Sequence, residues 1–155
     1  MALDTSAPAE ASASLWRLTP SGSTPNLPVA VHVVIARFDD PRIAQALVDQ
    51  ARDAEFQACW REAKHFDFDH AGLAGATTSD QVDVLDGYDD GSGLRYVAER
   101  SDPLGCEIHY DRFLNRYGPY LVRLSFTSCS VPLPDDARDT IARRILDQVR
   151  AAAGG

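Results

Sequence analysis

The apolar residues of the chain fall first into short segments that are typical of strands. The segment VAVHVVIARF, residues 29–38, is rich in β-branched residues and predicts the first strand. Polar and apolar residues alternate in QVDVLDGY (81–88) and in GLRYVAER (93–100), and the turn-forming DDGSG between them predicts a hairpin. Residues 106–129 predict a second hairpin with a tight turn.

Two longer segments show helical spacing instead. Between residues 39 and 63, apolar residues recur three and four positions apart, which predicts one amphipathic helix; they are Ile43, Leu47, Ala51, Ala54 and Ala58. By the same criterion residues 137–152 predict a closing helix, and residues 64–70 (KHFDFDH) predict a further short strand. We therefore predict the α+β class, with an antiparallel meandering sheet of about five strands and two helices packed on one face.

Composition narrows the class of partner. The chain has 155 residues, 45% of them hydrophobic, and so can bury a core in a single domain. Its formal net charge is −8 and it has no cluster of Lys and Arg, so we expect no nucleic-acid binding. No apolar run reaches the roughly 20 residues of a membrane span, so we expect no membrane insertion of this segment. No motif typical of a metal or cofactor site occurs, and we predict neither.

The first residues differ from the rest of the chain. Residues 1–24 are mostly small and polar and show no hydrophobic periodicity, so we predict that they form a flexible leader or tether. Residues 25–153 are then a single domain. Such a leader is typical of the tether that follows a signal sequence, a lipid anchor or a membrane helix, and a frayed cytoplasmic N-terminus is the alternative.

The three cysteines raise the question of a disulfide. A three-residue loop in the second hairpin would pair Leu114 with Val122, and it would turn Cys106 toward the core and Cys129 outward. The first helix covers the same face and carries Cys59 at the edge of its apolar stripe. We therefore predict a Cys59–Cys106 disulfide in preference to Cys106–Cys129. Three reduced cysteines in a cytosolic protein are the remaining alternative.

Two parts of the chain resemble a known family. The segment VAVHVVIARFDDPRIAQALVDQARDAEFQAC, residues 29–59, resembles the strand–helix–cysteine segment of actinobacterial extracellular sensor-type domains. Those domains occur at the C-termini of mycobacterial receptor serine/threonine kinases and in related lipoproteins. NRYGPYLVRLSF (115–126) and DDARDTIARRILDQVRAA (135–152) resemble the turn, outgoing strand and closing helix of that family. The resemblance implies an antiparallel sheet with helices packed on it, disulfide support and a ligand-binding groove.

Four residues of the second hairpin are candidates for contact with a ligand. Arg112 shares a strand face with Tyr110 and Leu114, and an inward arginine needs an acidic ligand or an Asp or Glu as its acceptor. Tyr117 and Tyr120 flank the turn, where aromatic rings with polar tips suit the rim of a site. The alternative roles are a salt bridge for Arg112 and the pinning of the turn for the two tyrosines.

Acid–base chemistry has its own candidates. In an extended HFDFDH segment, His65, Asp67 and Asp69 would share one face and could hold a divalent cation or an acid–base pair. His109 and Asp111 form a second such pair. The common alternative is a strand that buries its phenylalanines and exposes its charged face to solvent.

These observations predict an extracytoplasmic, sensor-like domain of the cell envelope that binds an unknown small molecule or envelope protein and performs no catalysis. The alternative is a small cytoplasmic α+β enzyme, resembling a cyclase or isomerase, that uses the His and Asp groups on an apolar metabolite.

Overall fold

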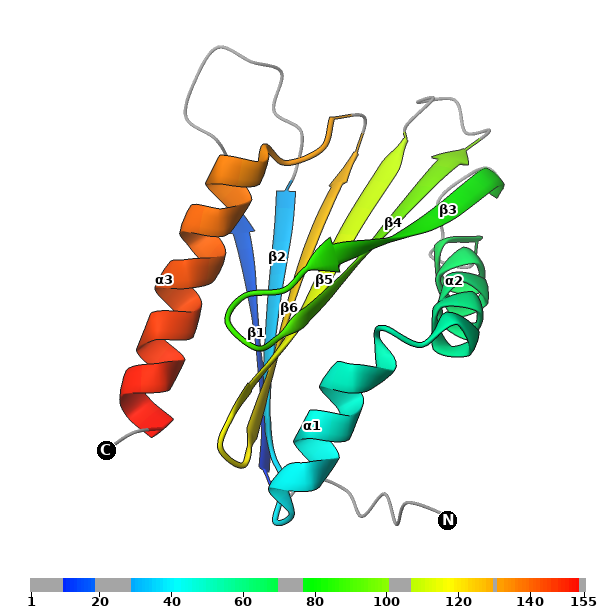
Figure 1. Ribbon diagram of the computed structural model, residues 1–155. Coiled ribbons are helices and arrows are strands. Elements are labelled where there is room, and N and C mark those ends of the chain that lie inside the picture. The colour runs from blue at the N-terminus through cyan, green and yellow to red at the C-terminus, as the bar shows by residue number, and fades with distance from the viewer. Residues whose placement is uncertain (1–9, 19–28, 70–76, 101–106, 130, 154–155) are drawn as a thin grey trace.

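The fold is one curved antiparallel sheet with helices on both sides. The computed structural model describes residues 10–18, 29–69, 77–100, 107–129 and 131–153. Within these residues the six strands have the spatial order β1-β2-β6-β5-β4-β3, and α3 lies on the opposite side of the sheet from α1 and α2 (Figure 1). The elements are β1 (Glu10–Leu18), β2 (Val29–Arg37), α1 (Pro41–Gln50), α2 (Ala54–Asp69), β3 (Thr77–Asp86), β4 (Ser92–Arg100), β5 (Ile108–Tyr117), β6 (Tyr120–Cys129) and α3 (Asp135–Ala153).

The predicted α+β class is confirmed, and three details differ. The described residues contain six strands and three helices, where the sequence predicts about five strands and two helices. The helices also cover both faces of the sheet. The additional strand, β1, lies within the predicted leader, where it pairs antiparallel with β2 over Glu10–Leu18. Without β1, strand β2 would be an open edge with unpaired backbone groups.

The register of the second hairpin differs from the predicted one by one residue. Tyr117 pairs with Tyr120, so the connection is the two-residue turn Gly118–Pro119, and Leu114 pairs with Arg123 instead of Val122. Gly118 has a φ of +57°, a left-handed conformation that glycine adopts without a steric penalty. The prediction assumed that the apolar residues of both strands lie on one covered face. They do not, because helices cover both faces.

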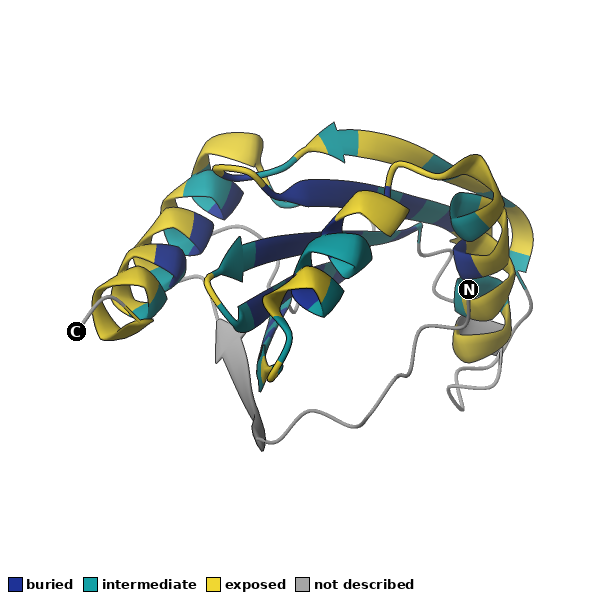
Figure 2. Ribbon diagram, turned by 60° about the horizontal axis from the view of Figure 1, so that its bottom comes forward, coloured by how far each residue is buried: buried dark blue, intermediate teal, exposed yellow. Residues whose placement is uncertain are grey.

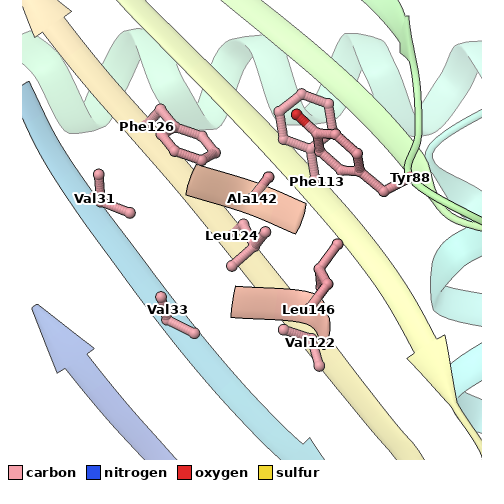
Figure 3. Packing of buried hydrophobic residues seen from close by; sticks show 9 residues of the cluster. All are labelled: Val31, Val33, Tyr88, Phe113, Val122, Leu124, Phe126, Ala142 and Leu146. Carbon is pink, nitrogen blue, oxygen red and sulfur yellow. The ribbon is translucent and has the colours of Figure 1, made fainter. Parts of the chain in front are cut away.

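The face toward α3 holds the largest core cluster of the described residues. Here Phe113 of β5 pairs with Leu124 of β6, and Val33 of β2 pairs with Leu124 from the other side. From α3, Ala142 and Leu146 pack onto these residues and are almost fully buried (Figure 3). The cluster consists of Val31, Val33, Tyr88, Phe113, Val122, Leu124, Phe126, Ala142 and Leu146.

The opposite face is covered by α1 and α2. On it, Leu114 and Leu121 pack with Ala44 and Val48 of α1. A second cluster gathers around Trp60 of α2 and is formed by Ala51, Trp60, Leu94, Tyr96 and Ala98. Each helix turns its buried residues toward the sheet and exposes its outer side (Figure 2). Adjacent residues of β5 therefore belong to different cores.

The predicted single helix over residues 39–63 is broken into two. Asp53 begins the second helix: its carboxylate accepts hydrogen bonds from the backbone N–H groups of Glu55 and Phe56, at 2.7 and 3.2 Å. The new helix starts with a new phase, so Trp60 is buried while Ala54 and Ala58 are exposed. This helix continues to Asp69, and the predicted strand over residues 64–70 is wrong for the part that the structure describes.

The same break changes the role of the cysteines. Cys59 is an exposed free thiol, because α2 turns Trp60 toward the sheet in its place. The predicted Cys59–Cys106 disulfide is therefore wrong, because Cys59 forms no disulfide. Cys106 itself lies outside the described residues. Cys129, at the end of β6, is disulfide-bonded.

Candidate ligand-binding site

A groove of ≈ 700 Å³ lies between α3 and the β2–β6 part of the sheet. Its walls are aliphatic: β2 contributes Val31, Val33 and Ile35. From α3 come Ile141, Ile145, Val149, Ala152 and Ala153, together with the polar Arg144 and Gln148. Tyr120 of β6 completes the lining. The volume lies within the range of about 300–1,000 Å³ that is usual for small-molecule sites.

The helix α3 forms the groove because it carries two adjacent stripes. Ala142 and Leu146 are buried and anchor α3 to the sheet. A second stripe lies beside this one on the surface of α3 and is only half-buried. It consists of Ile141, Ile145 and Val149. Their spacing of four residues keeps them on one line along the helix axis. The second stripe thus faces β2 across a gap that apolar side chains line from both sides.

Three polar side chains lie at this apolar groove. Arg144 and Gln148 are exposed residues of α3, one turn apart, and Tyr120 is half-buried at the start of β6. Within the described part of the chain, none of the three makes a hydrogen bond or an ion pair. An apolar pocket with a few unengaged polar groups at its edge is the usual form of a site for an amphipathic small molecule.

Of the predicted ligand residues, Tyr120 lies in this groove and Tyr117 fixes the neighbouring turn. The Tyr117 hydroxyl donates to Asp89 at 2.8 Å, and Arg150 of α3 pairs with Asp89 and lies over the Tyr117 ring. Burial, and then the bond to Asp89, raises the pKa of Tyr117 to about 12. The hydrogen bond from Tyr117 in turn lowers the pKa of Asp89. Tyr117 therefore connects the two hairpin turns to α3.

The other two predicted ligand residues lie on the opposite face. Tyr110 pairs with Thr127, and Arg112 pairs with Ser125, on the side covered by α1 and α2. The prediction that Arg112 shares a face with Tyr110 is thus confirmed. The four candidates do not form one site, because one pair lies toward α3 and the other toward the remaining helices.

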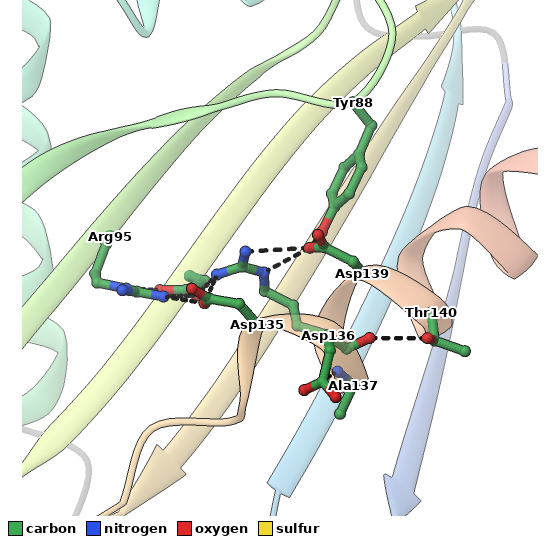
Figure 4. A network of polar contacts seen from close by, with 9 residues as sticks. Tyr88, Arg95, Asp135, Asp136, Ala137, Asp139 and Thr140 are labelled. Atoms are coloured by element: carbon green, nitrogen blue, oxygen red, sulfur yellow. Dashed lines mark hydrogen bonds and ion pairs between the residues drawn. The ribbon is translucent and has the colours of Figure 1, made fainter.

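Asp111 belongs to an ion-pair network beneath the first turn of α3. It is buried and accepts two hydrogen bonds from Arg95, at 2.7 and 2.8 Å, and one from Arg138, at 3.0 Å (Figure 4). Arg138 also pairs with Asp139, which accepts a hydrogen bond from Tyr88 at 2.7 Å. These contacts engage both oxygens of the Asp111 carboxylate. They join β4, β5 and α3 and point to a structural role for this predicted acid–base residue.

The remaining acid–base candidates are dispersed. His65 on α2 lies 3.0 Å from the Asp80 carboxylate of β3, while Asp67 pairs with Lys64 of its own helix. Asp69 is the last residue of α2. His109 on β5 lies 2.7 Å from Glu107. Among the described residues, no three His, Cys, Asp or Glu side chains gather in an arrangement that could hold a metal ion.

Comparison with known proteins adds little to this geometry. No known family and no curated protein matches the sequence. A solved structure with partial likeness is that of PA94, a Pseudomonas aeruginosa protein of unknown function; the two share 11% sequence identity over 91% of this chain and 81% of that one, with a TM-score of 0.34. A likeness of this degree says nothing about function. In the described residues, none of the helices has the length and apolar character needed to cross a membrane.

Sequence reasoning missed most of the groove. The predicted closing helix over residues 137–152 contains Ile141, Ile145 and Val149 at a spacing of four residues, but the spacing alone did not mark them as the lining of a groove. Arg144 and Gln148 follow Ile141 and Ile145 by three residues, so they lie at the edge of that stripe. The sequence therefore did contain a signal for these two polar residues of the groove. What the sequence does not show is that a second stripe, containing Ala142 and Leu146, anchors the helix and leaves the first one partly uncovered.

Proposed function

We propose that this protein is a non-catalytic ligand-binding domain of the cell envelope, and that its ligand occupies the groove between α3 and the sheet. The observation that carries this proposal is the combination of an aliphatic lining with three polar groups that make no hydrogen bond or ion pair to the described residues. The disulfide at Cys129 supports an oxidising compartment, since disulfides persist mainly outside the cytosol. The resemblance to extracellular sensor-type domains supports the same assignment.

The lining defines the chemical class of the ligand. Aliphatic side chains from β2 and α3 favour an elongated apolar body, because burying apolar surface contributes about 25 cal/mol per Å². The exposed Arg144 guanidinium favours an anionic group at the groove's edge, where Gln148 can add a hydrogen bond. A medium-chain fatty acid or a similar amphipathic carboxylate combines these properties.

Fluorescence titration with 11-(dansylamino)undecanoic acid tests this proposal. We expect saturable binding that dodecanoate displaces, with emission shifted to the blue by the apolar lining. Two matched variants locate the site. Ala152→Trp places an indole in the groove, whereas Ala151→Trp places it on a neighbouring exposed position that does not line the groove. Binding should weaken at least about tenfold in the first variant only, as expected when roughly 1.4 kcal/mol of contact is lost.

The anionic group is tested by a second pair. Arg144 lines the groove, while Arg143 lies over the Tyr88 ring. Arg144→Gln should weaken binding of dodecanoate but not of dodecanol, and Arg143→Gln should affect neither. An absence of saturable binding, or equal binding by the Ala152→Trp and Ala151→Trp variants, would refute the groove as the ligand site.

A further inference from the structure

Two arginines lie side by side on the face of the sheet opposite the groove. Arg112 of β5 pairs with Ser125, and Arg123 of β6 pairs with Leu114, so the two side chains are diagonal neighbours on the face toward α1 and α2. Both are half-buried, and the Nε–H group of each is fully buried and finds no hydrogen-bond acceptor among the described residues. Within the described part of the chain, neither arginine makes an ion pair.

This arrangement is costly for the isolated protein. Burial lowers the pKa of the Arg112 guanidinium, and the neighbouring charge of Arg123 adds to the effect. A partly desolvated charge with an unsatisfied donor costs free energy, and an oppositely charged acceptor recovers most of it. Elsewhere this chain supplies one: Arg95 and Arg138, on the other face, both pair with Asp111. Arg112 and Arg123 differ from these two arginines because no carboxylate of the described residues pairs with them.

The described surroundings of the pair contain one further unengaged donor, the indole N–H of Trp60, beside a tyrosine and a lysine that already have partners. The Tyr110 ring neighbours Arg112 on the same strand face, and its hydroxyl donates to Ser125 at 2.9 Å. Lys64 lies 5.1 Å from the centre of that ring and is itself paired with Asp67. The Trp60 ring lies 6.0 Å from the Tyr110 ring, and its indole N–H is buried with no acceptor in the part of the chain that the structure describes. The two arginine Nε–H groups and the indole N–H are all donors, which suits a ligand that offers only acceptors.

We propose that Arg112 and Arg123 bind a small oxyanion, a carboxylate or a phosphate, at a second site on the α1–α2 side of the sheet. The site is independent of the groove, from which the sheet separates it. An oxyanion supplies acceptors for both Nε–H groups at once and cancels the repulsion between the two guanidinium groups. This site would give Arg112 the acidic ligand that the sequence predicted for it, and it adds Arg123 as a second residue that binds the same anion.

Thermal unfolding of the full chain in sodium phosphate, sodium acetate and sodium chloride of matched ionic strength tests this site. We expect phosphate or acetate to raise the Tm by about 3 °C or more over chloride, because a ligand bound only to the folded state stabilises it. The more effective salt identifies the class of anion. The gain should disappear in Arg112→Met and Arg123→Met, and it should persist in Arg61→Met, which removes an exposed arginine of α2.

The unliganded variants provide a further readout. In chloride alone, Arg123→Met should melt above the wild type, because it removes the repulsion on Arg112. If a variant does not fold, NMR of the wild-type protein tests the site instead. The arginine Nε–Hε signals of Arg112 and Arg123 should shift saturably when phosphate or acetate is added. Uniform, non-saturating shifts of all arginines, or a Tm gain that the two arginine variants retain, would overturn the proposal.

Discussion

Arg138 of α3 and Asp111 of β5 form a buried ion pair with a hydrogen bond of 3.0 Å, and this pair attaches the first turn of the last helix to the middle of the sheet. Arg95 approaches the same carboxylate from β4. The groove depends on this attachment, because α3 is one of its two walls. The stability of the network is therefore a condition for ligand binding.

Asp111→Asn should lower the free energy of unfolding by about 2 kcal/mol, because it removes the buried carboxylate that Arg95 and Arg138 share and leaves them only the more exposed Asp135 and Asp139. Asp147→Asn is the matched control: Asp147 pairs with Arg150 on the exposed surface of α3, and its loss should cost about 0.5 kcal/mol or less. Chemical denaturation measures both. Equal effects of the two substitutions would show that the Asp111 network contributes no more than a surface pair.

Alkaline pH should destabilise the fold through Tyr88. Burial, and then the bond to Asp139, raises the pKa of Tyr88 to about 12, whereas an unfolded tyrosine titrates near 10. Between these values the unfolded state has released a proton that the folded state retains, so the free energy of unfolding falls as the pH rises. The difference between the tyrosinate absorbance titrations of wild type and Tyr88→Phe should have its midpoint near 12 in the folded protein and near 10 in urea. A folded-state midpoint near 10 would contradict the assignment.

The turn of the second hairpin offers a test of its register. A Cβ atom at Gly118 would meet no atom of the described residues within 4 Å, so the cost of Gly118→Ala comes from its φ of +57°. We expect a loss of about 1–2 kcal/mol in the free energy of unfolding for alanine. Gly118→Asn should cost less, because asparagine tolerates this conformation. If alanine costs nothing, the two-residue turn is not present.

The cysteines can be distinguished chemically. Unfolding without reductant should expose one free thiol per chain, and in the folded protein a thiol reagent should already label Cys59. Because the chain has three cysteines and Cys59 is free, we expect peptide mapping to link Cys129 to Cys106. Cys59→Ser should change stability by less than about 0.5 kcal/mol, and Cys129→Ala should cost about 2–4 kcal/mol. Three free thiols would contradict this assignment.

The sequence predicted the elements of this fold better than their relation to one another. Strands β2 to β6 and the closing helix α3 follow from alternation and helical spacing, which are local properties. The register of β5 and β6 does not, because Phe113 and Leu114 are both apolar and both buried, on opposite faces. Alternation then cannot show which face is covered. It also cannot show that Asp53 restarts the helix and turns Cys59 outward.

The candidate site shows the same limit. Arg112 was predicted as an inward arginine from its strand position alone, and the structure adds that no carboxylate of the described chain pairs with it. The groove required knowledge of how far α3 lies from β2 on the side of Ile145. That separation depends on the buried contacts of Leu146 and Arg138, which no local pattern reveals.

The most direct test of the central claim is methyl NMR of the folded protein during titration with dodecanoate. The methyl signals of Ile141, Ile145 and Val33, which line the groove, should shift saturably. Those of Val48 and Leu114, in the core on the other face of the sheet, should stay unchanged. Shifts at Val48 and Leu114 without shifts at Ile141 and Ile145, or no saturable shift at all, would contradict a ligand site between α3 and the sheet.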